Sequence, residues 1–508
     1  MRFIARTFTK SEMASPLKQL AGETAIYGLS TILARVINFL FVPFYTRLLT
    51  PESYGVVTEF LAYIAVLQVV LVLGLETGCF RFANKEGVNS SKVYSNAFWA
   101  VLGINAAFFA VLLAFAEPLS ALMGYVGHAQ CLIYMGGILL LDSVTAILFA
   151  KLRQEHKPLK FAILKTAKIL SETGANLYLF LAPQKPEWIY HFVSRTPDFS
   201  YVIFAIFVSC VVCALLFLPD FAKMSLRLDG KLLRQMLLYS LPLMIAALPG
   251  IFNDFLDRIL FRFLDNNPEG WRASLGIFQA SVKLAVIMNL FIQMFRFAAE
   301  PFFFQRAADK NSPQLYARVM NWFVAFCGLI FLGVMLYMDF ISLILGRDFR
   351  AGIGIVPIML LSYMILGMNF NVSMWYKLSG KTSMAIWITL SGLLITALVN
   401  VLFMPRFSYW ASAYGHLASY LAMFIISAAL GAKYYPIPYN WRKIALFFVV
   451  MGGCFALSQW MDNAWFPQTE SLSFNGAFWT KTGLHTILLA LYAATCYFIL
   501  KDKTLKQP

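Results

Sequence analysis

Basic, acidic and amide side chains recur at helical spacing inside segments that are apolar and long enough to cross a bilayer. In the clearest segment, from Gln279 to Pro301, the polar residues fall on one stripe: Gln279, Lys283, Gln293, Arg296 and Glu300. A charge at the bilayer centre costs roughly 2.5–3.5 kcal/mol on insertion scales, so such residues normally face a wet cavity or a partner. Arg296 and Glu300 are four positions apart and can neutralise each other, whereas Lys283 has no carboxylate three or four positions away. The stripe predicts a cavity that receives an anionic ligand.

Two further segments carry stripes of this kind. The first contains Thr24, Gly28, Thr31, Arg35, Asn38 and Thr46, and the second contains Lys165, Lys168, Glu172 and Asn176. Arg35 stays charged at any accessible pH. It is either a structural arginine at the end of a neighbouring helix or, with Asn38, a phosphate ligand. Lys165 is near enough to one end to snorkel, whereas Lys168 lies deeper and is a candidate ligand.

Acidic and basic residues also stand next to each other in the segment centred near residue 247, which contains Asn253, Asp254, Asp257 and Arg258. Adjacent residues on a helix do not face each other, so Asp257 and Arg258 should meet different neighbours. The preceding Pro249-Gly250 pair could break the helix and free carbonyls for an ion. Asp254, Asp257 and Glu300 are therefore candidates for coupling to Na⁺ or H⁺, with an interhelical ion pair as the alternative.

The sequence lacks the motifs of the common enzyme and cofactor sites. The histidines are scattered, and Cys210 and Cys213 form a CxxC inside an apolar segment with no histidine beside it. We find no metal-ligand spacing, no phosphate-binding loop, no dinucleotide fingerprint and no nucleophile elbow. The sequence thus predicts neither an enzyme nor a metal or cofactor site, and ATP is not expected as a direct energy source.

Composition places the chain in a membrane. Hydrophobic residues make up 60% and charged residues 13% of the 508 residues, about half the charge of a soluble protein. Roughly fourteen apolar runs are long enough to span, with centres near residues 35, 68, 104, 138, 170, 209, 247, 290, 326, 362, 392, 420, 450 and 488. We predict an all-α polytopic membrane protein of about fourteen helices without a sizeable soluble domain.

The net charge of +16 reflects membrane topology rather than binding of nucleic acid. Lysine and arginine cluster in alternate connections, as around Lys151, Lys231 and Arg306, and are missing near residues 117–130 and 462–475. This is the positive-inside pattern, and it places both termini in the cytoplasm. The N-terminus has no apolar core and does not read as a cleaved signal peptide; Met13 is an alternative start to Met1.

The chain repeats itself. The stretch from Tyr27, YGLSTILARVINF, is echoed about 212 residues later by YSLPLMIAALPGIF, and the LGIFQASVKLAVI run from Leu275 follows it. Tyr54-Gly55 matches Leu275-Gly276, and the AKLRQEHKP run from Ala150 matches YKLSGKTSM from Tyr376. Each half holds about six helices, so the repeats should be parallel. We predict a cytoplasmic segment (1–18), an N-lobe (19–222), a C-lobe (223–437), and two additional helices with a cytoplasmic tail (438–508).

Several runs carry a family resemblance: VPFYTRLLTPESYG from Val42, LGLETGCFRF from Leu73, YSLPL from Tyr239, FLDRILF from Phe255 and LGIFQASVKLA from Leu275. Over about residues 20–435 the chain resembles the polysaccharide biosynthesis branch of the multidrug/oligosaccharidyl-lipid/polysaccharide flippase superfamily. The resemblance implies two lobes and transfer of a lipid-linked oligosaccharide, usually on undecaprenyl pyrophosphate, across the bacterial inner membrane for surface polysaccharide or lipopolysaccharide. It also implies a cationic cavity lined by the first two helices of each lobe, which here hold Arg35, Arg258, Lys283 and Arg296.

Alternative functions remain open at this point. A lipid II flippase for peptidoglycan is a close alternative to the flippase of a lipid-linked oligosaccharide. A cation-coupled multidrug antiporter of the same fold is the other alternative, and it would favour an acidic cavity. A membrane glycosyltransferase or polymerase would need a large outer loop with catalytic acids, which the sequence lacks. Expected partners are the lipid-linked oligosaccharide, membrane lipids and the polysaccharide assembly machinery.

Overall fold

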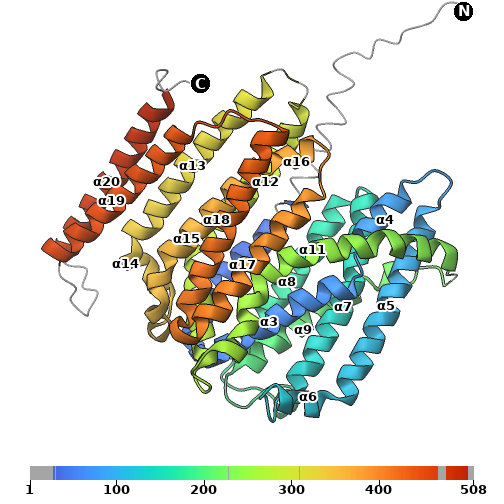
Figure 1. The fold of residues 1–508 in the computed structure, drawn as a ribbon. Coiled ribbons are helices and arrows are strands. Elements are labelled where there is room, and N and C mark those ends of the chain that lie inside the picture. Colours follow the sequence, from blue (N-terminus) through green and yellow to red (C-terminus); the bar gives the residue numbers. More distant parts are fainter. Residues whose placement is uncertain are drawn as a thin grey trace, which may run out of the picture. The chain divides into compact units, whose positions relative to one another are not determined.

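The computed structural model describes residues 27–28, 30–226, 228–307, 309, 311–466 and 476–501, which form helices and connecting turns and contain no β-strand (Figure 1). The α-helices after the first are α2 (Val42–Leu48), α3 (Pro51–Leu71), α4 (Leu75–Ala83), α5 (Ser90–Ala114), α6 (Ala116–Leu122), α7 (Ala129–Gln154), α8 (Pro158–Leu181), α9 (Phe199–Leu216), α10 (Leu218–Phe221), α11 (Gly230–Leu264), α12 (Trp271–Gln305), α13 (Ser312–Leu336), α14 (Met338–Ile341), α15 (Val356–Val372), α16 (Met374–Leu378), α17 (Met384–Phe407), α18 (Tyr409–Tyr434), α19 (Trp441–Trp465) and α20 (Gly476–Lys501). Three 3₁₀ segments interrupt them: η1 (Glu187–His191), η2 (Ser342–Ile344) and η3 (Arg347–Ile355). Thr24, Met1 and Met13 lie outside the described residues.

The helices confirm the predicted membrane architecture. Thirteen described helical stretches are long and apolar enough to span a bilayer, beginning with Ser30–Leu48 and ending with α20. They coincide with thirteen of the roughly fourteen predicted spans. The remaining prediction, near residue 170, coincides with α8, which is 24 residues long but carries Lys160, Lys165, Lys168 and Glu172 and is less apolar than the others.

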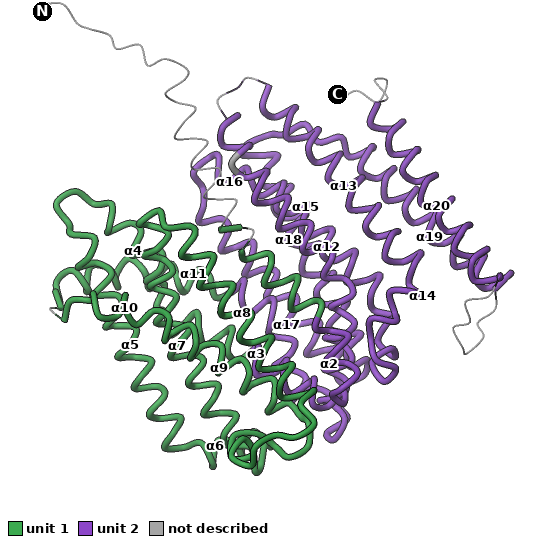
Figure 2. The backbone as a smooth tube through the Cα atoms, turned by 180° about the vertical axis from the view of Figure 1, so that it is seen from behind, with its two compact units in different colours: residues 1–40, 63–248 green, residues 41–62, 249–508 purple. Residues whose placement is uncertain are grey.

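Contacts divide the chain into two compact units (Figure 2). Unit 1 comprises residues 1–40 and 63–248, and unit 2 comprises residues 41–62 and 249–508. Residues 41–62, which include α2 and the start of α3, thus pack with the second half of the chain. The predicted lobes at 19–222 and 223–437 were defined by the sequence repeat, and their limits remain a prediction.

In unit 1, α7 is the central helix and packs against α5, α8 and α9. This helix and its neighbours supply an apolar core that includes Leu75, Val101, Ile147 and Phe217. The junction of α3 and α4 approaches α11 closely, because a Cβ atom at Gly74 would lie 2.6 Å from the carbonyl oxygen of Ser240. Gly74 also has a φ of +66°, a conformation that glycine adopts without strain.

In unit 2, α12 packs against α15 and η3, and α18 packs against both α15 and α17. The start of α3 crosses α12 at two glycines. A Cβ atom on Gly55 would overlap the carbonyl oxygen of Arg272, and one on Gly276 would overlap that of Pro51. Small residues allow such close backbone approach in membrane helices. Because Gly55 and Gly276 occupy matching positions of the sequence repeat, the crossing joins equivalent points of the two repeats.

The two additional helices, α19 and α20, pack on α13 (Figure 1). Ion pairs and hydrogen bonds stabilise this packing. The ammonium group of Lys481 lies 2.8 Å from Asp339 and 3.2 Å from Asp462. His485 contacts Asp462 through Nε2 at 3.1 Å and the carbonyl oxygen of Leu336 through Nδ1 at 2.6 Å. These contacts connect the ends of α13, α14, α19 and α20.

One expectation is wrong. The Pro249-Gly250 pair does not break its helix, because α11 runs without interruption from Gly230 to Leu264. Membrane helices tolerate proline where the surroundings compensate the lost backbone hydrogen bond. No freed carbonyls of a broken helix are therefore available for an ion at this position.

Candidate functional site

Arg258 of α11 and Lys283 of α12 are two cations without an ion pair to a described carboxylate, and we call them the cation pair. Neither forms an ion pair with any described residue, and Nε of Arg258 is buried without a hydrogen-bond partner among them. The guanidinium of Arg258 lies over the ring of Phe255 at 4.5 Å. Two cations in membrane-spanning helices without an ion pair to a carboxylate are costly, so the cation pair is a candidate site for an anion.

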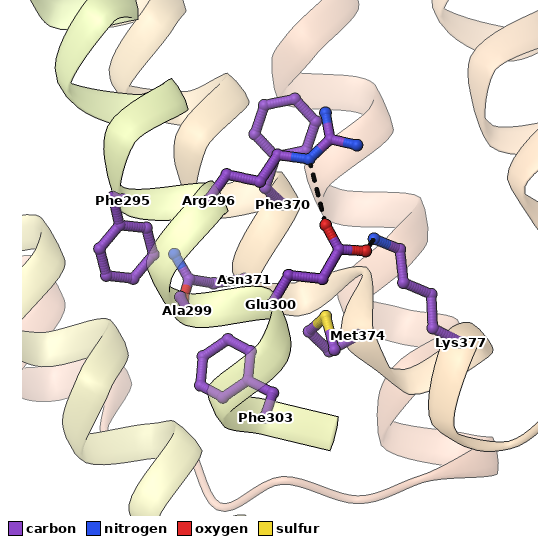
Figure 3. Close-up of a pocket in the computed structure, with 9 residues that line it drawn as sticks. All are labelled: Phe295, Arg296, Ala299, Glu300, Phe303, Phe370, Asn371, Met374 and Lys377. Carbon is purple, nitrogen blue, oxygen red and sulfur yellow. Dashed lines mark hydrogen bonds and ion pairs between the residues drawn. The ribbon is translucent and has the colours of Figure 1, made fainter. Parts of the chain in front are cut away.

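A second group of charges surrounds Glu300 near the end of α12 (Figure 3). The carboxylate of Glu300 contacts the ammonium group of Lys377 at 2.5 Å and Nε of Arg296 at 3.4 Å. These side chains line a pocket, which we call the Glu300 pocket, together with Phe295, Ala299, Phe303, Phe370, Asn371 and Met374. One carboxylate thus balances two cations, and the charged groups of the pocket carry a net positive charge.

A buried polar network connects α11, α17 and α18. Asp257 is fully buried and its Oδ2 lies 3.1 Å from Nε2 of His416. Asn253 accepts hydrogen bonds from the hydroxyl groups of Thr396 at 2.6 Å and Ser419 at 3.0 Å. Hydrogen bonds of this kind hold membrane helices together. Asp257 therefore belongs to an interhelical acid–base pair, which could also hold a proton.

Asp254 lies one turn from this network and differs from Asp257 in exposure. Its carboxylate accepts a hydrogen bond from the hydroxyl group of Tyr420 at 3.1 Å, and the residue is exposed whereas Asp257 is buried. Among the described residues, no group of three or more histidine, cysteine or acidic residues could hold a metal ion. The candidate coupling residues are thus arranged as one buried pair and one accessible acid.

The candidates in unit 1 have different surroundings. Lys168 forms an ion pair with Asp142 at 2.5 Å, and both side chains are largely buried. A neutralised lysine is a weaker candidate for binding an anion than the cation pair. Arg35 and Asn38 are exposed on the helix that begins at Ser30.

The predicted site residues differ in the side chains that they contact. The structure confirms the contact between Arg296 and Glu300. Three partners were missed in the sequence: Lys377, Asp142 and His416. Each lies far along the chain from the residue that it contacts, and only Lys377 had a signal, because it lies in a run that matches the other half of the repeat.

A family model described as "Polysaccharide biosynthesis protein" matches residues 20–307, more than half of the chain. The chain belongs to this family. The assignment confirms the resemblance and makes the chain a multi-pass membrane protein of the polysaccharide biosynthesis type. Its matched region includes Arg258, Lys283, Arg296 and Glu300 but ends before Lys377 and His416. No curated protein sequence matches the chain.

Solved structures show that the fold of this family member is shared with known transporters. The lipid II flippase MurJ in an inward closed conformation superposes with a TM-score of 0.68 at 12% sequence identity, over 94% of this chain and 99% of that one. MATE in complex with MaD3S gives a TM-score of 0.55 at 13% identity, over 82% and 96% of the two chains. MATE in the straight conformation also gives 0.55, at 14% identity over 82% and 96%. At these identities the likeness is one of fold.

Proposed function

We propose that the protein is a flippase that moves a lipid-linked oligosaccharide, carried on undecaprenyl pyrophosphate, across the bacterial inner membrane for surface polysaccharide or lipopolysaccharide synthesis. Membership of the polysaccharide biosynthesis family supports the glycan class. The observation that carries the proposal is the cation pair, because Arg258 and Lys283 lack carboxylate partners among the described residues of membrane-spanning helices. A pyrophosphate supplies the missing negative charge.

The chemistry of the cargo explains what the cations do. The obstacle is the hydrophilic head group, which loses its water when it enters the hydrocarbon layer. Arg258 offers a planar fork that matches two phosphate oxygens, and Lys283 offers a compact charge. Both replace the lost water at the pyrophosphate, while the lipid tail stays in the bilayer. The cations thus lower the barrier without changing a covalent bond, and we propose a transporter rather than an enzyme.

Energy for directional transport is proposed to enter through the buried network. Asp257 and His416 can bind and release a proton, and Asp254 offers an accessible carboxylate nearby. We therefore propose coupling to H⁺ at Asp257, with Na⁺ at Asp254 as the alternative. Glu300 is better explained by its two cationic partners. No cofactor is part of the proposal.

Two other functions are compatible with the fold. A lipid II flippase would use the same pyrophosphate chemistry, and the likeness to MurJ extends over 94% of the chain. A cation-coupled multidrug antiporter has the MATE fold, but the cation pair and the Glu300 pocket are basic and would repel a cationic drug. We therefore rank the antiporter last. Expected surroundings are the inner membrane with both termini in the cytoplasm, membrane lipids and the polysaccharide assembly machinery.

A cellular experiment tests the proposed function. Deletion of the gene should remove surface polysaccharide and leave its lipid-linked precursor in the inner leaflet, and a plasmid copy should restore export. Loss of peptidoglycan synthesis instead would favour the lipid II alternative. Normal surface polysaccharide and unchanged precursor distribution in the deletion strain would contradict the proposal.

A further inference from the structure

His485 of α20 is a buried histidine whose two ring nitrogens both contact oxygen atoms. The residue is 3% exposed, its Nδ1 lies 2.6 Å from the carbonyl oxygen of Leu336, and its Nε2 lies 3.1 Å from Oδ1 of Asp462. A carbonyl oxygen and a carboxylate only accept hydrogen bonds, whereas a neutral imidazole has a single N–H to donate. Both contacts are hydrogen bonds only when His485 and Asp462 together hold one proton more than a neutral imidazole and a carboxylate do.

The surroundings of His485 favour placing this proton on the ring. Leu336 is the last residue of α13, so its carbonyl oxygen lies at a helix C-terminus, whose partial negative charge stabilises a nearby cation. The other oxygen of Asp462 lies 3.2 Å from the ammonium group of Lys481, which stabilises the ionised carboxylate. The site therefore contains an imidazolium and a carboxylate rather than a neutral imidazole and a carboxylic acid.

The charges around His485 balance while its ring is protonated. Lys481 also lies 2.8 Å from Asp339 of α14, so the imidazolium and one ammonium group face two carboxylates from α14 and α19. The end of α13 adds an uncharged contact, between the hydroxyl groups of Tyr337 and Thr486 at 2.7 Å. Loss of the ring proton leaves one cation for two acids and places an acceptor nitrogen against an acceptor oxygen. Deprotonation thus replaces a hydrogen bond with a repulsive contact.

His416 makes no comparable demand for a second N–H. Its Nε2 lies 3.1 Å from Asp257, but its Nδ1 has no hydrogen-bond partner among the described residues. A neutral ring with its proton on Nε2 satisfies that contact. The requirement for an additional proton therefore follows from the geometry of His485 and is not shared by His416.

The proton of His485 lies where the two additional helices meet the rest of unit 2. α19 and α20 pack on α13 and on each other (Figure 1). The side chains of Asp339 and Asp462 are 41% and 20% exposed, so water reaches one side of the cluster. The connection at residues 462–475 contains no lysine or arginine, which predicts that this end of α19 lies at the outer face of the membrane. Protons of the outer compartment are thus expected to have access to the site.

We propose that His485 and Asp462 form a proton-binding site that holds α19 and α20 on α13, and that loss of the proton undocks this pair of helices. The site is separate from the candidate coupling residues of α11, and the proposal does not depend on the cargo. The docked form keeps a proton that a water-exposed histidine gives up above about pH 6.5. As the pH rises beyond that value, the ratio of undocked to docked protein should increase by up to about tenfold per pH unit, until the docked form also loses the proton.

The protonation state of His485 is measured directly by solid-state nitrogen NMR. The full-length protein, isotope-labelled at histidine, is studied in lipid vesicles, and the signals of His485 are those missing from the spectrum of His485→Gln. Both ring nitrogens of His485 should carry a proton at a pH at which the exposed His191 has lost one. A neutral His485 ring in the docked protein would overturn the proposal.

Docking of α20 is measured as a distance to α13. Nitroxide labels are attached through a ketone-bearing amino acid at Phe326 of α13 and Ile487 of α20, two exposed positions, which leaves the buried cysteines unmodified. Pulsed electron paramagnetic resonance in nanodiscs should give one narrow distance distribution about one pH unit below the usual imidazole value of about 6.5, and an added component at longer distance about two units above it. An identical distribution at both pH values would overturn the proposal.

Asp462→Asn separates the proton from the packing. The amide of this variant can donate from Nδ2 to Nε2 of a neutral ring, while Nδ1 still donates to Leu336. The variant should therefore stay docked at both pH values, with Lys481 still paired with Asp339. His485→Gln removes the titrating ring and should also abolish the pH response, so either variant is sufficient if the other is not monodisperse. An undiminished pH response in these variants would overturn the proposal.

Tyr492→Phe is the matched control at the same helix interface. It removes the hydrogen bond from the hydroxyl group of Tyr492 in α20 to the carbonyl oxygen of Ala325 in α13 at 3.3 Å, without changing the His485 site. This variant should keep the parental change in distance between the two pH values. Loss of that change would show that any weakening of the interface removes the pH response, which would overturn the assignment of the response to His485.

Discussion

Asp257 and His416 are hydrogen-bonded across α11 and α18, with 3.1 Å between Oδ2 and Nε2. Asp257 is fully buried and His416 is 5% exposed. Nδ1 of His416 is also buried and has no partner among the described residues. A buried carboxyl group and an imidazole in hydrogen-bond contact can share one proton. Proton coupling is therefore tested by changing Asp257 and His416.

Replacing Asp257 with Asn should uncouple transport from a proton gradient. The change removes the charge and nearly preserves the shape, so cargo binding should persist. Transport in vesicles should fall to the rate measured without a gradient, and His416→Gln should have the same effect. The measurement is the transport rate with and without an imposed pH difference.

Asp265→Asn is a suitable control for Asp257→Asn. Asp265 follows α11 directly and accepts a hydrogen bond from the hydroxyl group of Ser408 at 2.6 Å, but it lies outside the network. This variant should respond to the gradient like the parent. Unchanged gradient dependence in both Asp257→Asn and His416→Gln would make the pair structural, and a response of Asp254→Asn alone to a Na⁺ gradient would move coupling to Asp254.

The cation pair should be required for export. Arg258→Ala and Lys283→Ala should each reduce surface polysaccharide by tenfold or more, since one buried charge-assisted contact contributes about 1.5–3 kcal/mol. Arg258→Lys should restore part of the export, because it keeps the charge but loses the fork. Surface polysaccharide is measured beside the amount of protein in the membrane.

Arg306→Ala provides the control for the loss of a cation. Arg306 is exposed and forms an ion pair with Asp309 at 3.2 Å in the connection after α12. Export should stay at the parental level in this variant. Normal export in Arg258→Ala and Lys283→Ala, with protein present in the membrane, would count against phosphate recognition by the cation pair.

The glycine crossing should be intolerant of a single methyl group. Gly55→Ala or Gly276→Ala places a Cβ atom on the carbonyl of the opposite helix, and overpacking of this kind typically costs 1–3 kcal/mol. Thermal unfolding in detergent should shift to lower temperature in both variants. Gly103→Ala in α5 is the control, since a Cβ atom there meets nothing within 4 Å. Equal melting temperatures for all three variants would show that α3 and α12 can separate freely.

The ion pairs of Lys481 should hold α19 and α20 against α13 and α14. Lys481→Met leaves Asp339 and Asp462 without their shared cation and should cost roughly 1–2 kcal/mol, less than in a fully buried site because the acids are partly exposed. Limited proteolysis between α19 and α20 should become faster. Arg195→Ala removes a surface ion pair with Glu187 and should change neither the stability nor the rate of proteolysis. Equal proteolysis of Lys481→Met and the parent would contradict this role.

Periodicity predicted the helices well because length and apolarity are local properties. The span near residue 362 illustrates the limit, since the structure builds it from η3, α15 and α16 rather than from one helix. Charges were recognised as exceptional, but their partners depend on packing between distant segments. Glu300 and Lys377 are 77 residues apart, and Asp257 and His416 are 159 apart. The helix break predicted at Pro249-Gly250 is absent, because packing of membrane helices can compensate the backbone hydrogen bond that proline removes.

The most direct test of the central claim is transport by the purified protein in vesicles. The substrate is a fluorescent oligosaccharide on undecaprenyl pyrophosphate, and its exposure is measured by the access of an added glycosidase. The account predicts that the parent exposes the oligosaccharide on both leaflets and that the double variant Arg258→Ala/Lys283→Ala does not. Neither protein should move a cationic dye. Equal transport of the oligosaccharide by parent and double variant, or transport of the dye in its place, would contradict the account.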